Sequence, residues 1–507
     1  MVLIEKAEGR RRFVALGFVL LSLLAAIPLV TVKLPPILDY PNHMARMYLI
    51  AVLPGATDLA RYYRIAWDPL PDLAFDAVVP WLMHGMSVEV AMQLALGVTL
   101  LALAGGCIAL HRAAFHRWSL WPLFAFLLLY NRVLLWGFLN YLAGLALMLW
   151  ALAAWVAMER KPVLLRVAVG AIAATAIYLA HLAAFGCYAV AIVAFSLAPH
   201  GTERVDVIAK LRRAAPALVS LLPGIILFLD GPTSGASTHF GYGNPLRKFD
   251  LPVSVFDNYN RIFDGTTFAV VLIAVIAGLK WRAIILHDRL RWCLAALLVA
   301  FVIVPTRLLS ASGIDHRLPI AIALVFVAVS GWGAVSTKRR QTITGLLLAL
   351  LLVRMAVIET VWLRADREYD ALRPMFDKIA PGAKVTVAAP VTDVQAGGVP
   401  LYHFATLAVI ERHAFVDTMF ADPHQQPLRL QDCVYPLWAK HLPAVLWQAA
   451  ADGALPPLDG YDDMIIVDPQ AKLDPAKLPG TVTFAVPRMM LVHLSHPARP
   501  SETEHAQ

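Results

Sequence analysis

Long apolar runs alternate with short basic segments through the first 360 residues of the chain. A helix needs about 20 apolar residues to cross the hydrocarbon core of a bilayer, and several runs approach that length. The pattern therefore predicts about eleven transmembrane helices. They lie at roughly 13–32, 88–110, 118–130, 138–158, 163–180, 183–198, 214–229, 266–280, 292–306, 318–335 and 341–359.

The basic segments between these runs fall on one side of the predicted membrane. They are 10–12, 112–117, 159–161, 210–213, 280–291 and 338–340. Because Lys and Arg concentrate in cytoplasmic loops, we expect that side and the amino terminus to be cytoplasmic. The first run keeps its basic flank and has no clear small-x-small cleavage site, so we interpret it as a retained anchor. An odd number of spans then places residues 361–507 outside.

The composition agrees with an integral membrane protein and excludes a soluble fold of this length. Hydrophobic residues make up 59% of the 507 residues, charged ones 15%, and the mean hydropathy is +0.65. A soluble domain carries about 25% charged residues. The net charge of +8 lies in short clusters between apolar runs rather than along one face, so we predict an inner-membrane protein with no nucleic-acid partner.

The pattern changes after residue 360, which divides the chain into two predicted domains. Residues 1–360 form the multi-span domain, whose first outer loop is 34–87. In residues 361–507, short strand-like runs alternate with helical stretches, which predicts a small extracytoplasmic α/β domain. The strand-like runs are 384–391, 463–468 and 489–495. No disulfide is expected in this domain, because Cys433 is its single cysteine.

The first outer loop opens with a carboxylate, an imidazole and a guanidinium close together. In "LPPILDYPNHMAR" (34–46), Pro41 suits the first turn of a helix, Asp39 precedes that helix, and His43 and Arg46 share one of its faces. Such a carboxylate can take a proton from a hydroxyl or amine, and an arginine can hold a phosphate through two hydrogen bonds. The alternative, equally open here, is that Asp39 caps the helix, His43 packs and Arg46 extends toward water.

The stretch "DYPNHMARM" resembles the "DE…Y…AREM" stretch of the C-type (GT-C) integral membrane glycosyltransferases, among them the protein O-mannosyltransferase and aminoarabinose transferase types. The resemblance covers about residues 1–360. It implies a polytopic GT-C-like fold in which Asp39 is the general base and Arg46 contacts the phosphate of a polyprenyl-phosphate sugar. Tyr40 stands where the family has a second acid, so a divalent metal stays an open question and no metal ligand is assigned. His43 has no family counterpart and is a further catalytic candidate.

Other polar residues near the outer side are candidates for binding the donor or its sugar. Asn140 and Tyr141 in "GFLNY" open a predicted span. Arg247 and Arg261 lie in a glycine-rich loop, 230–265. A second Asp-His-Arg group, Asp315, His316 and Arg317, precedes the tenth run and could hold a phosphate or a sugar hydroxyl. For each arginine, anchoring at the membrane interface is the alternative.

The predicted function is an inverting glycosyltransferase that moves a sugar from a polyprenyl-phosphate donor to an envelope glycan, lipid or protein on the outer face. The lipid-linked sugar is then a substrate, and no other cofactor is predicted. Two alternatives are a transporter or flippase, and a non-catalytic partner in envelope polysaccharide assembly. A pair of helices broken in mid-span would favour a transporter, and we find no such pair in the sequence. The sequence leaves open the sugar, the acceptor and the oligomeric state.

Overall fold

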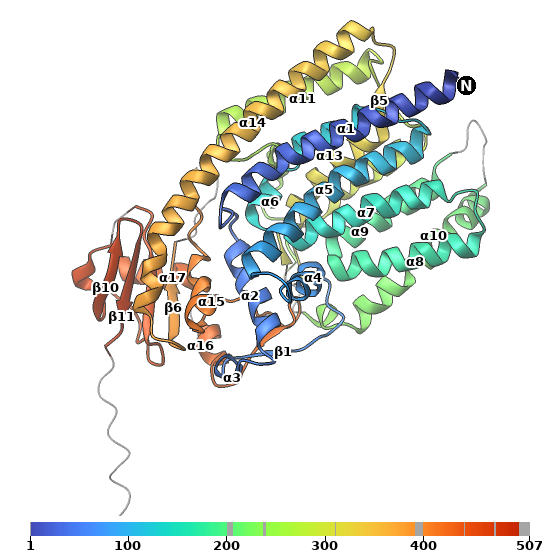
Figure 1. Ribbon diagram of the computed structural model, residues 1–507. Helices are drawn as coiled ribbons and strands as arrows, with labels where there is room; N and C mark the ends of the chain where they lie inside the picture. The colour runs from blue at the N-terminus through green and yellow to red at the C-terminus, as the bar shows by residue number, and fades with distance from the viewer. Residues whose placement is uncertain are drawn as a thin grey trace, which may run out of the picture.

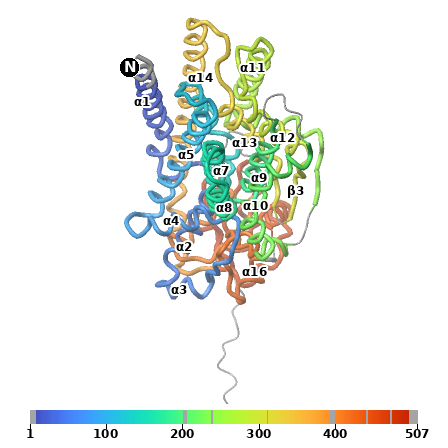
Figure 2. The backbone as a smooth tube through the Cα atoms, turned by 90° about the vertical axis from the view of Figure 1, so that its right-hand side faces the viewer, coloured from blue at the N-terminus to red at the C-terminus, as the bar shows by residue number. Residues whose placement is uncertain are grey.

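The computed structural model describes residues 2–199, 206–236, 240–309, 311–390, 399–440, 442–470 and 473–495. A bundle of long helices carries a β-sheet at one end, which we call the sheet end (Figure 1). The start of α1 lies at the opposite end of the bundle (Figure 2). The bundle helices are α1 (Val2–Thr31), α5 (Val88–Phe115), α7 (Leu139–Ala157), α8 (Val163–Ala180), α9 (Leu182–Leu197), α10 (Val207–Asp230), α11 (Arg261–Lys280), α12 (Arg291–Ile303), α13 (Ile314–Val329) and α14 (Thr337–Leu372).

Ten of the eleven predicted runs coincide with one of these helices. The run at 118–130 instead forms a short 3₁₀ helix, η1 (Trp121–Leu128), which has Pro122 in its first turn and is buried along most of its length. Among the described residues, seven helices are long and apolar enough to cross a membrane, and three apolar helices are shorter. The prediction of membrane-spanning helices is confirmed, whereas the count of about eleven stays a prediction.

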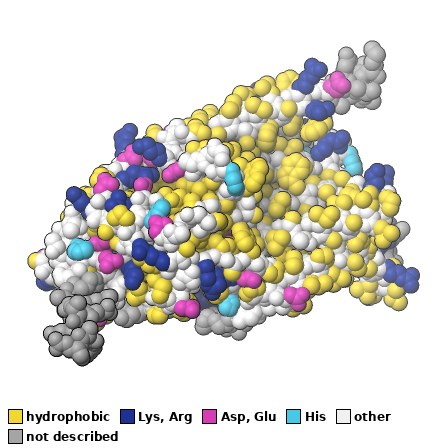
Figure 3. All heavy atoms as spheres, turned by 60° about the horizontal axis from the view of Figure 1, so that its bottom comes forward, with side chains coloured by type: hydrophobic (Ala, Val, Ile, Leu, Met, Phe, Trp, Pro, Cys, Tyr) yellow, Lys and Arg dark blue, Asp and Glu magenta, His cyan; other side chains and the backbone are white. Residues whose placement is uncertain are grey.

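The outer surface of the bundle is apolar, as a lipid-facing surface must be. Large hydrophobic side chains such as Leu164, Ile172 and Ile273 are exposed along its helices. Figure 3 shows hydrophobic atoms across this part, with charged side chains gathered toward its ends. Inside the bundle, Arg354 of α14 donates from Nη1 to Asp264 Oδ1 of α11 over 3.0 Å. Buried charges in such a bundle are paired because an unpaired charge is costly there.

Residues 34–87 form a compact segment at the sheet end. It contains α2 (Tyr40–Val52), α3 (Thr57–Ala60), β1 (Tyr63–Ile65) and α4 (Ala74–Leu82). Helix α2 packs against α4, α5 and the C-terminal elements η7 and α15, so nearly all of its side chains are buried. Strand β1 pairs antiparallel with β8 (Leu428–Leu430), which ties the predicted first outer loop to the C-terminal part of the chain.

Short elements complete the bundle between its long helices. They are α6 (Arg132–Trp136), η2 (Pro232–Gly235), η3 (Pro245–Phe249), η4 (Leu251–Val255), β2 (Ile284–Leu286), β3 (Arg307–Leu308), β4 (Ala311–Ser312) and β5 (Ser330–Trp332). Strands β2 and β5 pair antiparallel, as do β3 and β4.

The C-terminal sheet has five strands in the order β10-β11-β9-β6-β7. Strand β6 is parallel to both of its neighbours, and the other pairs are antiparallel. The elements are η5 (Arg373–Lys378), β6 (Lys384–Ala388), η7 (Phe404–Leu407), α15 (Ala408–Arg412), β7 (Phe415–Val416), α16 (Tyr435–Lys440), α17 (Pro443–Ala451), β9 (Asp463–Val467), η8 (Pro475–Lys477), β10 (Thr481–Val486) and β11 (Met489–His493). The three strand-like runs of the sequence contain β6, β9 and β11.

The boundary predicted at residue 360 falls inside α14, a helix of 36 residues. At 1.5 Å per residue, such a helix is about 54 Å long, well beyond the roughly 30 Å of a hydrocarbon core. Helix α14 therefore runs from the bundle into the C-terminal part without a linker (Figure 1). The division into two separate domains stays a prediction.

Candidate functional site

A cavity of about 1130 Å³ lies where the sheet end of the bundle meets the C-terminal part. One wall is apolar and comes from α9 and α12, with Phe185, Val190 and Leu297 among its residues. Most of the polar lining residues come from the segment 34–87, the start of α7, the start of α13 and residues 402–426. Its ionisable side chains are Asp39, His43, Asp72, Tyr141, His181, Cys187, Arg317, Tyr402, His403, Asp417 and Asp422.

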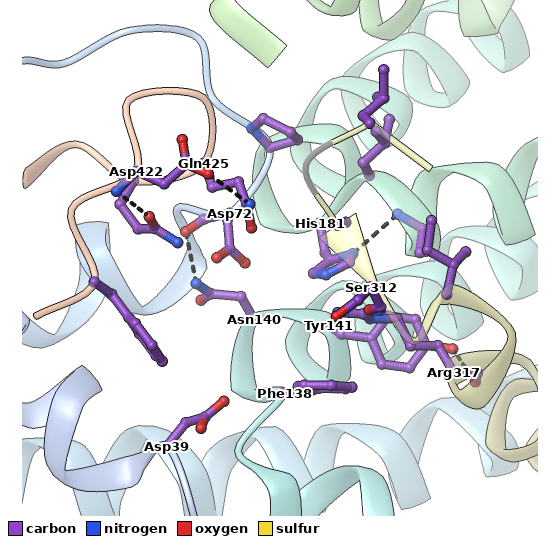
Figure 4. A pocket seen from close by; sticks show the side chains of 18 of the residues that line it. Asp39, Asp72, Phe138, Asn140, Tyr141, His181, Ser312, Arg317, Asp422 and Gln425 are labelled. Atoms are coloured by element: carbon purple, nitrogen blue, oxygen red, sulfur yellow. Dashed lines mark hydrogen bonds between the residues drawn. The ribbon is translucent and has the colours of Figure 1, made fainter. Parts of the chain in front are cut away.

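Asp39 precedes α2 and makes no side-chain capping hydrogen bond to that helix. Its carboxylate instead faces the cavity (Figure 4), where Oδ1 lies 3.4 Å from Nε2 of His403. The Asp39 backbone N–H donates to the Trp136 carbonyl over 3.3 Å. Asp39 is thus held by backbone on one side and presents its carboxylate to the cavity on the other.

The turn formed by Trp136, Gly137 and Phe138 supports Asp39. Gly137 has φ +96°, and a Cβ atom there would stand 2.6 Å from the Asp39 Cβ. Only glycine fits both this backbone conformation and this close approach. The Phe138 ring lies across the cavity from Asp39 and beneath Arg317 (Figure 4). The glycine of "GFLNY" therefore serves the packing of the site.

His43 faces the cavity as a neutral ring. Its Nε2–H donates to the Gly137 carbonyl over 3.0 Å, and because a carbonyl can only accept, the proton lies on Nε2. Burial, helped by the nearby Arg46 charge, lowers the pKa of His43 well below its usual value. Nδ1 is buried and has no hydrogen-bond partner among the described residues. His43 can thus accept a hydrogen bond in the cavity.

Arg46 lies outside the cavity, contrary to the role that the family resemblance implied. Its Nε donates to Asp76 Oδ1 over 2.8 Å and its Nη2 to Asp76 Oδ2 over 2.9 Å. Both side chains are fully buried between α2 and α4. A guanidinium that already grips a carboxylate through two bonds cannot offer them to a phosphate. We therefore interpret Arg46 as a packing residue and do not carry it into the site.

Arg317 is the arginine that lines the cavity. Its Nη1 donates to the backbone carbonyls of Ser312 and Gly313 over 2.9 Å each, and the guanidinium lies 4.1 Å above the centre of the Phe138 ring. Its Nε is buried and has no hydrogen-bond partner within the described ranges. The structure therefore brings Asp39 and Arg317, far apart in the sequence, to one cavity. The Arg317 Nε–H is still available to donate a hydrogen bond.

The remaining members of the second Asp-His-Arg group point elsewhere. Asp315 accepts a hydrogen bond from Thr306 Oγ1 over 2.8 Å, and His316 packs against the Trp136 ring at 4.8 Å. Neither is among the described residues that line the cavity. Arg247 and Arg261 are exposed and also lie outside its described lining. Four sequence candidates are thus not brought to the site.

Asn140 and Tyr141 line the cavity, and their role in binding the donor stays a prediction. Asn140 fixes the start of α4, because its Oδ1 accepts from the Phe75 N–H and its Nδ2 donates to the Asp72 carbonyl, each over 2.7 Å. The Tyr141 hydroxyl donates to the backbone carbonyl of Arg317 over 2.7 Å. Both residues therefore position their neighbours while facing the cavity.

Seven ionisable residues of the described cavity lining were not among the sequence candidates, and Asp72, Asp417 and His403 are three of them. Loss of contact with water raises the pKa of Asp72 to about 7, although the nearby Arg46 charge works in the opposite direction. Burial likewise raises the pKa of Asp417 to about 7, against a hydrogen bond from Thr386. The third is His403. Asp72 lay in an acid-rich loop, a weak signal, whereas no sequence pattern marked the two C-terminal residues.

No group of three or more His, Cys, Asp and Glu side chains that could hold a metal ion occurs within the parts of the chain that the structure describes. The carboxylates of the cavity are spread over different elements, with Asp39, Asp72 and Asp422 apart in Figure 4.

Comparison with known proteins adds a likeness of fold. No protein-family model and no curated protein sequence matches the chain. The crystal structure of ArnT from Cupriavidus metallidurans in the apo state is 14% identical, with a TM-score of 0.51 over 95% of this chain and 98% of that one. The chain has the fold of ArnT. The same protein bound to undecaprenyl phosphate gives a TM-score of 0.50 at 12% identity, over 95% and 97% of the two chains.

The likeness extends over the C-terminal part as well as the helix bundle, because almost the whole of each chain is covered. ArnT is a GT-C glycosyltransferase, an aminoarabinose transferase. The GT-C resemblance that "DYPNHMARM" suggested is thereby confirmed for the fold, beyond the 1–360 range that the sequence indicated.

Proposed function

We propose that the chain transfers a sugar from a polyprenyl-phosphate donor to an acceptor in the cell envelope. The observation that carries the proposal is the cavity, in which a carboxylate at Asp39 and a guanidinium at Arg317 share one space with an apolar wall. A polyprenyl-phosphate sugar has matching parts: an apolar tail, an anionic phosphate and a polar sugar. The ArnT structure with undecaprenyl phosphate supports a lipid donor of this class.

In this reaction Asp39 is the base. Its carboxylate accepts the proton of the acceptor hydroxyl or amine while the acceptor oxygen or nitrogen attacks the anomeric carbon. The bond from that carbon to the phosphate oxygen breaks, and polyprenyl phosphate leaves with the bonding electrons. Attack from the side opposite the phosphate inverts the anomeric configuration. His43 Nδ1 is placed to accept a hydrogen bond from a sugar or acceptor hydroxyl.

Arg317 stabilises the departing phosphate. Its Nη1 is committed to two backbone carbonyls, which fix the guanidinium, and its buried Nε has no partner among the described residues. A fixed cation with unused N–H capacity, in a site partly shielded from water, stabilises the charge that develops on the leaving oxygen. The Phe138 ring beneath it excludes water from one face.

The proposed orientation places the amino terminus in the cytoplasm and the cavity at the outer face of the inner membrane. It rests on the basic segments of the sequence and on the start of α1, which lies at the end of the bundle opposite the sheet end. A periplasm-active reporter fused after residue 507 should be active. An inactive reporter there, with an active cytoplasmic one at the same position, would reverse the proposed orientation.

The activity test is transfer of labelled sugar from polyprenyl phosphate to total envelope acceptors in vesicles that carry the protein. The parent protein should transfer label, and the Asp39→Asn variant should not. Absence of transfer by the parent protein, together with movement of the intact lipid across the membrane, would favour the transporter alternative instead.

A further inference from the structure

The C-terminal part of the chain places one side chain against the proposed base. His403 lies just before η7, is 7% exposed, and directs Nε2 toward Asp39 Oδ1 at 3.4 Å. The ring is held on two sides, edge-on to Phe420 at 5.0 Å and to Tyr402 at 4.8 Å between centres. Such a ring has little freedom to rotate away from Asp39.

Asn42 determines which nitrogen of His403 carries the proton. The Asn42 Oδ1 accepts from the Phe420 N–H over 2.9 Å, and its Nδ2 donates to the Thr418 carbonyl over 2.7 Å, so the amide can have only one orientation. The same Nδ2 lies 3.1 Å from His403 Nδ1. Because an amide nitrogen only donates, Nδ1 accepts, and the proton of the neutral ring is on Nε2. The atom that faces Asp39 is therefore a donor.

We propose that His403 is a positioning residue for Asp39, held by Asn42 in the tautomer that donates from Nε2 to the carboxylate. The inference rests on the proposed function of Asp39 as the base. One carboxylate oxygen is oriented by His403, which leaves the other for the acceptor. The site is then incomplete without residues 402–420, because both the donor and the groups that fix it come from the C-terminal part and α2.

Two substitutions at residue 403 separate positioning from packing. His403→Gln keeps an N–H group at about the reach of Nε2, whereas the side chain of His403→Asn is too short to reach Asp39. A misplaced reacting group costs up to about a hundredfold in rate. We expect His403→Asn to lower kcat roughly tenfold to a hundredfold with little change in KM for the lipid donor, and His403→Gln to restore kcat to within about threefold of the parent.

His413 provides a matched control. It also connects the segment 34–87 to the C-terminal part, because its Nε2 lies 2.9 Å from the Tyr48 hydroxyl and its Nδ1 pairs with Asp58, but it is not among the described residues that line the cavity. Its φ of +50° is tolerated by asparagine. His413→Asn should leave kcat unchanged. An equal loss of kcat in His413→Asn and His403→Asn, or no difference between the two variants at 403, would overturn the inference.

A spectroscopic measurement tests the contact without an activity assay. In ¹⁵N spectra of the full-length protein labelled at histidine, the His403 signals are those that disappear in His403→Gln. They should report a proton on Nε2, and Asp39→Asn should shift the Nε2 signal more than the Nδ1 signal. A proton on Nδ1, or an Nε2 signal that does not shift in Asp39→Asn, would refute the pairing of His403 with Asp39. This holds even in a protein that transfers no sugar. Failure of transfer by the parent with the pairing intact would instead count against the proposed function.

Discussion

Arg46 and Arg317 both lie on helices near the cavity, yet their guanidinium groups have different partners. Arg46 is fully buried, and its two bonds to Asp76 join α2 to α4. Arg317 is held by backbone carbonyls and keeps a buried Nε without a partner in the described parts of the chain. Arg46 Nη1 is also buried without a partner among the described residues, but the Arg46 charge is neutralised by Asp76 and the residue is not in the described cavity lining, whereas Arg317 lines the cavity and has no carboxylate hydrogen-bonded to it within the described ranges.

The difference shows what decides the role of an arginine in such a protein. A carboxylate that binds the guanidinium through two bonds removes it from ligand binding, while carbonyl oxygens fix its position without forming an ion pair. The carboxylates differ in the same way. Both oxygens of Asp76 accept hydrogen bonds from Arg46, whereas the Asp39 carboxylate faces the cavity.

The largest expected effect comes from the two carboxylates, each changed to the amide. Asp39→Asn keeps size and polarity but cannot accept a proton, so transfer should fall by roughly a hundredfold to ten-thousandfold with little change in stability. Asp76→Asn should show the opposite result, a marked loss of stability. Transfer rates and thermal unfolding in detergent, measured side by side, check both. Parent-like transfer by Asp39→Asn would eliminate the proposed base.

Arg46→Met removes one partner of the buried pair. The uncompensated Asp76 carboxylate should lower the free energy of unfolding by about 3–5 kcal/mol. The double variant Arg46→Met/Asp76→Leu replaces both charges and should recover much of that loss. Denaturant or thermal unfolding of the purified proteins measures this. A single variant as stable as the parent would show that the pair does not stabilise the α2–α4 contact.

Arg317→Ala should weaken donor binding rather than stability. A charge-assisted hydrogen bond contributes about 1.5–3 kcal/mol, which corresponds to roughly tenfold to a hundredfold in affinity. Binding of undecaprenyl phosphate, compared between the parent, Arg317→Ala and Arg317→Lys, measures the effect, and lysine should restore part of the affinity. Unchanged binding in Arg317→Ala would contradict its assignment to the phosphate.

The smallest effect concerns pH and Asp72. Burial raises the pKa of Asp72 to about 7 in the folded protein, from 3.8 as the reference value. The folded state then holds a proton that the unfolded state releases, so this group costs stability as pH rises from about 4 to 7. Asp72→Asn should remove the cost and stabilise the protein by about 1 kcal/mol above pH 7, since Asp72 is only partly buried and solvent screening limits the effect. Melting curves at pH 5 and pH 8 check it. A variant with the same pH dependence as the parent would exclude this role.

The sequence predicted the parts of the protein that depend on local pattern. Apolar run length located the bundle helices, and the proline and aspartate of the first outer loop located the start of α2. The short stretch around Asp39 led to the GT-C fold. The run at 118–130 was predicted as a span because its composition alone is apolar, although it folds as a 3₁₀ helix packed within the bundle.

The pairing of side chains could not be predicted in the same way. Arg46 is occupied because Asp76, thirty residues later, returns to it on α4. His403 meets Asp39 across more than 360 residues of sequence, and only the docking of the C-terminal part on α2 brings them together. Arg317 and Arg261 looked alike in the sequence, yet one lines the cavity and the other is exposed. These outcomes depend on tertiary packing.

The turn at Trp136, Gly137 and Phe138 touches both sides of the cavity at once. Gly137 lies against Asp39, and Phe138 lies under Arg317. Three residues span at most about 11 Å, so this turn limits the separation between Asp39 and Arg317. With the donor proposed above, the two side chains act on one linkage, the bond between the anomeric carbon and the phosphate oxygen. A diphosphate donor has the same linkage at the sugar but adds a second phosphate on the lipid side, and Arg317 is the single Lys or Arg in the described lining. We therefore expect lower turnover with a diphosphate donor than with the matched monophosphate donor.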